Sequence, residues 1–543
     1  MSNGIFSVPQ PYNEPIKSYQ PGSPERHELK QKLVELQSTQ IEVPLIIGGE
    51  EVKTSNLGEM RAPHNHDLEL GVYHRAGKKE VDRAIKAALS AQQAWAKMPW
   101  EHRASIFLKA ADLLSGPWRS TLNGATMLGQ SKTVHQAEID AACELSDFWR
   151  FNIHYIQEIM AEQPYSPPGF WNRCEYRPLE GFVFAVTPFN FTSIAGNLPT
   201  APAMVGNVIV WKPASSAVYS AYYVMRLLEE AGIPPGVINF IPGSGGEVGD
   251  PALASPDLSG IHFTGSTEVL QNMWKAVGYG ITKMKSYPRI VGETGGKDFI
   301  FVHHSADLEP LVVAAIRGAF EYQGQKCSAA SRMYIPASLW PRFKDRYVAE
   351  VAQIRMGPPE DFRNFMAAVI DKTAFEKIKS YIDDARKSNE ADIITGGKCD
   401  ESTGYFIEPT TILTTDPQFK TMKEEIFGPV LTIYVYEDSK IDEIIRLCDQ
   451  TSPYGLTGAI WAQDRGQLVK MSHALRNAAG NFYINDKPTA AVVGQQPFGG
   501  GRASGTNDKA GSKWNLLRWM SVRTIKETMV PSEEWRYPFM EEE

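Results

Sequence analysis

Cysteine is scarce in this sequence, which has five among 543 residues, all far apart and none in a CxxC pair. A disulfide-rich secreted domain and a thiolate zinc site both need closer spacing, so we predict a reducing compartment and no metal site. The adjacent His303 and His304 do not change this expectation, because neighbouring side chains on a strand point to opposite faces.

Positive charge is also limited, with 55 Lys and Arg against 63 Asp and Glu, which gives a formal net charge of -8. No long run of either sign occurs, so the basic stripe that binds nucleic-acid phosphates is missing and no nucleic-acid partner is expected. The chain is nevertheless 43% hydrophobic and 10% aromatic, which excludes disorder over most of it. Its length corresponds to about two to four domains.

One uncharged stretch, residues 181–211, has the length of a membrane span. Its three prolines and three asparagines argue against one, because proline breaks a helix and a bare amide is costly in lipid. We predict a buried strand, loop and helix there, and no membrane insertion. The first 25 residues contain one lysine and no arginine, so neither a secretory signal nor a mitochondrial presequence is visible.

The hydrophobic pattern changes along the chain. Helical periodicity marks 78–115 and 131–155, and from 180 onward short apolar runs alternate with helix-sized segments. A second alternating region begins at 298. This alternation predicts parallel strands joined by crossover helices, and therefore an α/β fold with two such domains. We interpret the proline-marked segment before 180 and the last thirty residues as excursions that pair with another subunit.

The segment FEYQGQKCSAASR suggests a nucleophile. Cys327 follows Gly324, which permits close approach of backbone to a ligand, and the small residues 328–331 leave room around its sulfur. Lys326 and Arg332 are close in sequence and are expected to favour the thiolate. The alternative is a buried cysteine that only fills space.

Two further polar residues lie in apolar surroundings. Glu293 stands between glycines at the end of a strand-like run, where burial raises a carboxyl pKa and suits a general base; the alternative is a helix cap. Asn190 lies in the loop TPFNF, where its amide can donate to an oxyanion or merely tie the loop together. The glycine-rich GSGGEVG is not a dinucleotide fingerprint, since Val248 occupies the third required position.

Seven motifs together resemble the aldehyde dehydrogenase superfamily, in order and spacing, from about residue 45 to the end: TPFNF, WKPA, FTGS, ETGGKDF, QKC, EEIFGP and PFGG. Longer segments resemble the members that oxidise L-glutamate γ-semialdehyde: SPERHEL, AEIDAACELSDFWRFN, GQKCSA, RNAAGNFYINDKPT and VGQQPFGGGRASGTNDKAG.

The resemblance implies a Rossmann-like NAD domain, an α/β catalytic domain and a small oligomerisation β-flap. The implied divisions are an N-terminal arm (1–45), the first part of the NAD domain (46–161), an oligomerisation hairpin (162–179), the Rossmann-like part (180–293), the catalytic domain (294–485), a substrate anchor loop and return (486–512) and a C-terminal oligomerisation segment (513–543). The name anchor loop is used below for 486–512.

The resemblance also implies the cofactor contacts. Thr187, Lys212 and Ser215 would lie near the adenosine, residues Gly265, Ser266, Thr267, Glu268 and Val269 by the pyrophosphate, and Glu425 and Phe427 at the nicotinamide ribose and ring. Many relatives that use only NAD carry a glutamate at the position of Ser215. NAD is therefore the expected cofactor, with NADP tolerated at lower preference.

The implied reaction is NAD-dependent oxidation of L-glutamate γ-semialdehyde to glutamate, in proline catabolism. Cys327 attacks the aldehyde, Asn190 and the Cys327 backbone N–H stabilise the oxyanion, and Glu293 activates the water that cleaves the thioester. The implied substrate contacts are Glu144, Phe191, Lys326, Ser328, Ala490, Ala491 and Phe498. Two positions depart from the common pattern: Ala490-Ala491 replaces Gly-Ser, and Asp298 replaces an asparagine.

Alternatives of other classes are another semialdehyde dehydrogenase of the superfamily, a catalytically silent binding protein of the same fold, and a cysteine hydrolase. A silent relative would lack Cys327, Glu293 or Asn190, and all three are present. A hydrolase would need a histidine paired with Cys327, and no motif contains a histidine suited to that role. By resemblance we expect a homodimer or higher homo-oligomer in the mitochondrial matrix, with the cytoplasm as the alternative compartment.

Overall fold

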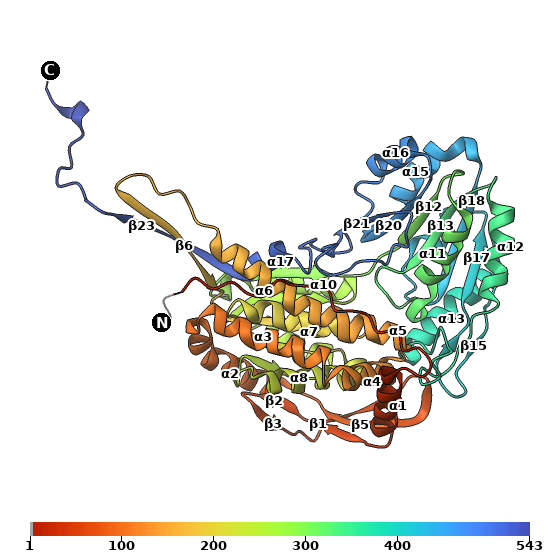
Figure 1. The fold of residues 1–543 in the computed structure, drawn as a ribbon, viewed down its shortest axis with the longest axis horizontal. Helices are drawn as coiled ribbons and strands as arrows, with labels where there is room; N and C mark the ends of the chain where they lie inside the picture. Colours follow the sequence, from red (N-terminus) through yellow and green to blue (C-terminus); the bar gives the residue numbers. More distant parts are fainter. Residues whose placement is uncertain (1–3, 543) are drawn as a thin grey trace.

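The computed structural model describes residues 4–542 and places two seven-stranded sheets in two lobes (Figure 1). The first sheet has the order β11-β10-β7-β8-β9-β2-β3 and is parallel from β11 to β9. Its strands are β2 (Leu45–Ile47), β3 (Glu50–Val52), β7 (Phe182–Val186), β8 (Val208–Lys212), β9 (Ile238–Phe240), β10 (Leu258–Thr264) and β11 (Arg289–Glu293).

Helices connect and cover the first sheet. Their bounds are α2 (Lys78–Lys97), α3 (Trp100–Ser115), α7 (Thr192–Met204), η2 (Ser215–Ala217), α8 (Val218–Ala231), α9 (Gly245–Leu253), α10 (Thr267–Gly280) and η3 (Ile281–Lys283). The uncharged stretch 181–211 forms β7, α7 and β8, as predicted, and its strands are almost entirely buried because the sheet is covered on both faces. No helix within residues 4–542 is long and apolar enough to cross a membrane.

The second sheet has the order β14-β17-β18-β13-β12-β20-β21, and only β14 runs antiparallel to its neighbour. The strands are β12 (Asp298–Val302), β13 (Ala330–Pro336), β14 (Ala391–Thr395), β17 (Thr410–Thr414), β18 (Val430–Tyr436), β20 (Thr457–Trp461) and β21 (Asn481–Ile484). Its lobe also contains α11 (Leu308–Phe320), η4 (Glu321–Gly324), α12 (Trp340–Val351), α13 (Lys372–Lys387), α14 (Lys420–Lys423), η5 (Asp438–Lys440), α15 (Ile441–Gln450) and α16 (Arg465–Ala474).

The remaining elements surround these sheets. They are α1 (Pro24–Gln37), α4 (Arg119–Gln130), α5 (Val134–Ala137), the π-helix η1 (Glu138–Glu144), α6 (Leu145–Ala161), α17 (Lys513–Leu517), η6 (Pro538–Met540), a sheet of β1 (Ile41–Val43), β5 (Asn65–His74) and β4 (Leu57–Ala62), and the short pairs β15 (Cys399–Asp400) with β16 (Phe406–Ile407) and β19 (Tyr454–Gly455) with β22 (Gly501–Arg502). The predicted alternation of strands and helices from 180 onward is confirmed.

A two-stranded ribbon projects from the body (Figure 1). It consists of β6 (Phe170–Pro178) and β23 (Met520–Thr528), which pair antiparallel over nine residues each. The strand in the segment 162–179 thus finds its partner near the C-terminus of the same chain rather than within the segment.

The assumption that the two adjacent histidines lie on a strand was wrong. Strand β12 ends at Val302, so strand alternation does not apply to His303 and His304, and their ring centroids lie 3.9 Å apart. Among residues 4–542, no group of three or more His, Cys, Asp or Glu side chains is arranged to hold a metal ion.

Candidate active site

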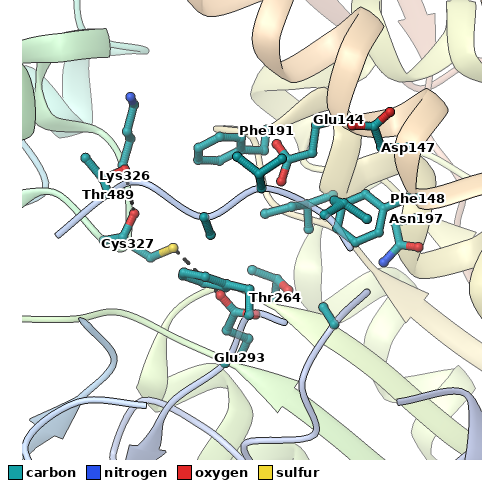
Figure 2. Close-up of a pocket in the computed structure, with 18 of the residues that line it drawn as sticks. Glu144, Asp147, Phe148, Phe191, Asn197, Thr264, Glu293, Lys326, Cys327 and Thr489 are labelled. Carbon is teal, nitrogen blue, oxygen red and sulfur yellow. Dashed lines mark hydrogen bonds between the residues drawn. The ribbon is translucent and has the colours of Figure 1, made fainter. Parts of the chain in front are cut away.

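A cavity of about 630 Å³ lies between the lobes, and its wall includes Cys327 and Glu293 (Figure 2). All seven predicted substrate contacts line the same cavity as this pair: Glu144, Phe191, Lys326, Ser328, Ala490, Ala491 and Phe498. Thr489, which bonds Ser328, lines it too. Glu144 and Phe498, 354 positions apart along the chain, therefore meet at one cavity.

The loop that carries Cys327 is held in an unusual backbone conformation. Tyr322, Gln323 and Gly324 all have positive φ angles, of 51°, 56° and 65°. A Cβ on Gly324 would come within 2.2 Å of the Gly428 carbonyl oxygen, so only glycine fits there. Such strain persists only where the surroundings hold it, and here it turns Cys327 toward the cavity.

Two glutamines hold this loop, and sequence reasoning missed both. The Gln323 Oε1 accepts from the backbone N–H of Ala367 at 3.0 Å, while its Nε2 donates to the Ala368 carbonyl at 2.7 Å. Gln325 Oε1 accepts from the backbone N–H of Ile370 at 2.9 Å. The only sequence signal is the repeated glutamine in EYQGQKC, which by itself does not indicate a partner.

The thiol and the predicted base are in contact. Cys327 Sγ donates to Glu293 Oε1 at 3.8 Å, the dashed line of Figure 2; the cysteine is buried and the glutamate is partly buried. Burial raises the pKa of Glu293 to about 7, with the Cys327 hydrogen bond and the Lys509 charge acting in the opposite direction. Glu293 ends strand β11, so the strand-end placement is confirmed and the helix-cap alternative is wrong.

The prediction that Lys326 and Arg332 favour the Cys327 thiolate was wrong. Lys326 Nζ pairs with Glu321 at 3.1 Å, and Arg332 donates to the Lys297 carbonyl at 2.8 Å, so both charges are engaged away from the sulfur. Burial and then the Glu293 charge raise the pKa of the Cys327 thiol well above its usual value. The cysteine is therefore a neutral thiol that needs a base, and Glu293 is the carboxylate that touches it.

Asn190 lies against the cysteine loop. Its side chain is buried, and Nδ2 donates to the Gln325 carbonyl at 3.1 Å, two residues before Cys327. This bond ties the two loops together, which was one of the two roles the sequence suggested for Asn190. It also fixes the Asn190 amide beside the nucleophile. The oxyanion contact stays a prediction.

The predicted cofactor residues gather at one edge of the first sheet. Thr187, Lys212 and Gly265 lie at the carboxyl ends of β7, β8 and β10, which are neighbours in the parallel sheet. Ser266 caps α10 by accepting from the Val269 N–H at 3.4 Å, and this 14-residue helix directs its free N–H groups toward that edge. An edge of this kind, with a helix N-terminus between strands, fits a dinucleotide.

Other residues at this edge fit the same cofactor. Burial lowers the pKa of Lys212 to about 8, and within residues 4–542 its Nζ has only the Pro213 carbonyl, at 3.2 Å, as a hydrogen-bond partner. Ser215 Oγ donates to the Gly243 carbonyl at 3.3 Å. A lysine so weakly paired within the protein is available to a ribose hydroxyl or a phosphate.

Glu425 and Phe427 come from the other lobe. Glu425 accepts from the Gly296 N–H at 2.9 Å, and a Cβ on Gly295 would lie 2.1 Å from the Glu425 carboxylate, so the glycine of ETGGKDF is needed for this approach. Phe427 has a φ of 61° and its ring meets Phe189 edge to face at a centroid distance of 5.8 Å.

Asp298, one of the departures from the common pattern, has a physical explanation. Its Oδ1 accepts from the Thr457 N–H at 2.7 Å, and burial raises the pKa of the carboxyl to about 8. The raised pKa favours the protonated carboxyl, which can accept on one oxygen and donate on the other, as an asparagine amide does.

Hydrogen bonds and a cation–π contact hold several of the predicted substrate contacts in place. Ser328 Oγ donates to Thr489 Oγ1 at 3.0 Å, and Glu144, at the end of the π-helix η1, accepts from Ser193 Oγ at 3.0 Å. Burial raises the pKa of Glu144 to about 8. The Lys132 ammonium lies 4.2 Å from the centre of the Phe191 ring.

The model of the aldehyde dehydrogenase family matches residues 52–525, and the chain belongs to that family. The resemblance found in the sequence is thereby confirmed. Among relatives, the mitochondrial delta-1-pyrroline-5-carboxylate dehydrogenase of Dictyostelium discoideum is 53% identical, over 98% of this chain and 96% of its own. The human mitochondrial enzyme of the same name is 50% identical, over 97% of this chain and 94% of its own. The NAD-bound crystal structure of Delta-pyrroline-5-carboxylate dehydrogenase from Mycobacterium tuberculosis has a TM-score of 0.96 and 51% identity, covering 99% of this chain and 100% of that one.

Proposed function

We propose that this protein oxidises L-glutamate γ-semialdehyde, which is in equilibrium with 1-pyrroline-5-carboxylate, to L-glutamate with NAD, a step of proline catabolism. The observation that carries the proposal is the Cys327–Glu293 contact of 3.8 Å in a cavity that is also lined by Ser328, Ala490 and Ala491. Relatives at about half identity over nearly the whole chain carry the name of this activity.

The residues divide the reaction between them. Glu293 accepts the Cys327 proton at Oε1, and the sulfur adds to the aldehyde carbon, while the Asn190 amide and the Cys327 N–H receive the oxyanion. When bound, NAD supplies the acceptor for the hydride that leaves the thiohemiacetal carbon. Glu293 releases the first proton to solvent, takes a second one from the water that attacks the thioester, and returns it to the Cys327 sulfur as glutamate leaves, which restores the thiol. Thr187, Lys212, the N-terminus of α10 and Glu425 would hold NAD.

The substrate's α-carboxylate should decide specificity. Ser328 and the backbone N–H groups at Ala490 and Ala491 lose their partner when the carboxylate is missing, and unpaired buried donors cost about 2 kcal/mol, or about 30-fold. We therefore expect kcat/KM for glutamate semialdehyde to exceed that for butyraldehyde by at least about 30-fold.

Steady-state NADH formation with both aldehydes tests the proposal. Succinate semialdehyde, which keeps a carboxylate but lacks the α-ammonium group and is one carbon shorter, serves as a third substrate. Equal specificity constants for glutamate semialdehyde and butyraldehyde would overturn the proposal. A preference for succinate semialdehyde would instead favour another semialdehyde dehydrogenase of the family.

We expect the protein to accept NADP as well as NAD. Ser215 brings no carboxylate to the ribose, so the Coulombic barrier to a 2′-phosphate is absent there, and Lys212 is close in sequence to attract it. We expect measurable activity with NADP, below that with NAD, and a clear fall in the NADP/NAD ratio in Ser215→Glu. Ser216→Glu, one residue on in the same turn, is the control for the added charge. An undetectable NADP rate in the parent, or an unchanged ratio in Ser215→Glu, would contradict the expectation.

We also propose a homodimer or higher oligomer built on the β6–β23 ribbon and the segment that follows it. This segment extends away from the body in Figure 1 and exposes large apolar side chains: Met529, Val530, Trp535, Tyr537 and Phe539. An apolar surface of this kind is typical of subunit contacts. The mitochondrial matrix is the proposed compartment, supported by the names of the Dictyostelium and human relatives.

A further inference from the structure

The N-terminal arm reaches the substrate cavity, although the sequence linked no function to it. Before α1 the chain runs along the helical layer that covers the first sheet (Figure 1). Four consecutive residues of the arm, Asn13, Glu14, Pro15 and Ile16, line the same cavity as Cys327 and Ala490.

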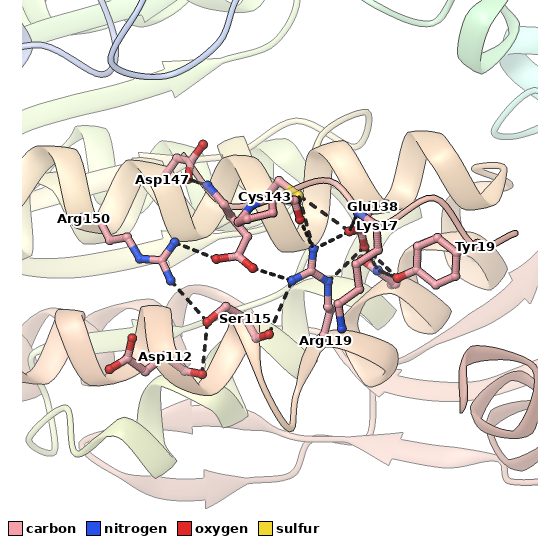
Figure 3. Close-up of polar contacts among 12 residues, drawn as sticks. Lys17, Tyr19, Asp112, Ser115, Arg119, Glu138, Cys143, Asp147 and Arg150 are labelled. Atoms are coloured by element: carbon pink, nitrogen blue, oxygen red, sulfur yellow. Dashed lines mark hydrogen bonds and ion pairs between the residues drawn. The ribbon is translucent and has the colours of Figure 1, made fainter. Parts of the chain in front are cut away.

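Buried charges fix the arm in place. Glu14 accepts from Arg119 at 2.6 Å and from Arg150 at 2.8 Å, and both guanidinium groups are almost wholly buried among the contacts of Figure 3. Glu138 in turn accepts from the Lys17 backbone N–H at 2.8 Å and from the Tyr19 hydroxyl at 2.7 Å. Removing one partner of a buried ion pair is costly, so the arm is part of the folded domain rather than a loose extension.

Asn13 uses this fixed position to bridge two elements. Its Nδ2 donates to Asp147 Oδ2 on α6 and to the Val493 carbonyl of the anchor loop, both at 2.8 Å. Its Oδ1 accepts from Gln495 Nε2 of the same loop, also at 2.8 Å. The Glu14 N–H donates to the other Asp147 oxygen at 2.7 Å, so the arm and α6 are tied twice.

We infer that Asn13 is a positioning residue that holds the anchor loop in place for the substrate carboxylate, so that the N-terminal arm completes the substrate site. Ala490 and Ala491 have no side-chain donors, and the loop can bind a carboxylate there only through backbone N–H groups. The position of backbone donors depends on the path of the loop, and Asn13 bonds that loop two and four residues farther on. The inference rests on the proposed function, since it concerns the same carboxylate.

The test compares Asn13→Ala with Gln495→Ala and with the double variant, using glutamate semialdehyde and butyraldehyde. Loss of the two bonds to the loop should raise KM for glutamate semialdehyde about tenfold in Asn13→Ala, with KM and kcat for butyraldehyde and the Tm unchanged. The double variant should be no worse than Asn13→Ala, because Gln495 acts through the same amide. Gln10→Ala, an exposed position on the same arm, is the matched control and should equal the parent.

The outcomes separate this inference from the proposed function. A parent that oxidises both aldehydes equally well refutes the proposed function and this inference with it. A parent that discriminates between them, with an Asn13→Ala variant that discriminates equally, refutes the inference alone. An equal loss with both aldehydes, or a lowered Tm that accounts for the change, would show that Asn13 supports the fold rather than the loop.

Discussion

Cys327→Ser should lower NAD-dependent aldehyde oxidation by at least about a thousandfold. A serine hydroxyl is a much poorer nucleophile, and a carboxylate whose pKa is about 7 is too weak a base to ionise it. NADH formation at saturating aldehyde and NAD measures the loss. The Tm should stay near that of the parent, because the side chain changes by one atom and the loop is held by Gln323 and Gln325 instead.

Cys399→Ser and Cys174→Ser are the matched controls for that variant. Both cysteines are half-buried and lie on the short strand β15 and on the projecting ribbon, away from the cavity. We expect both variants to retain the parent's rate. Appreciable turnover by Cys327→Ser, or a comparable loss in either control, would contradict the assignment of the nucleophile.

Glu293→Gln should lower kcat by about 10² to 10⁴, the usual contribution of a positioned general base. Because Glu293 contacts the Cys327 thiol directly, we expect the first-turnover burst of NADH to slow along with the steady state. Stopped-flow measurement of the burst and the steady-state rate tests this. Glu309→Gln, which changes an exposed carboxylate on α11, is the control. A full burst followed by slow turnover would mean that Glu293 serves only the water that cleaves the thioester.

The pH profile provides a second test of the same residue. Burial raises the pKa of Glu293 to about 7, and the group acts as a base only when ionised. The kcat/KM of the parent should therefore be low at acidic pH and rise as the pH increases through about 7. This acidic limb of the profile should be missing in Glu293→Gln. A limb near pH 7 that survives the substitution would belong to another group.

The electrostatics of the site illustrate why local sequence misleads. Lys326 and Arg332 are near Cys327 along the chain, yet Glu321 and the Lys297 carbonyl engage them. Burial raises the pKa of the thiol most, and carboxylates that raise it further, Glu293 and Glu425, come from other segments. Charge falls off with distance in space, so sequence proximity does not predict which charges a buried group experiences.

The order of amino acids was sufficient for features that depend on local chemistry. The charge-free run 181–211, which forms β7 and most of β8, and the helical period of α2 predicted the elements, because side-chain periodicity must match the backbone that buries it. Glycines beside Glu293 and small residues after Cys327 likewise marked the two reacting groups before their contact was known. The motif set then identified the family.

Only the tertiary structure brought distant segments together. The thiol–carboxylate contact, the glutamine contacts of the Cys327 loop and the bridge from Asn13 to Val493 all join residues that no short motif contains. Asn13 and Val493 are 480 positions apart, and their bond exists because buried charges on α4 and α6 hold the arm beside the anchor loop. Long-range contacts of this kind follow from packing and ion pairing in three dimensions, which single-sequence patterns do not encode.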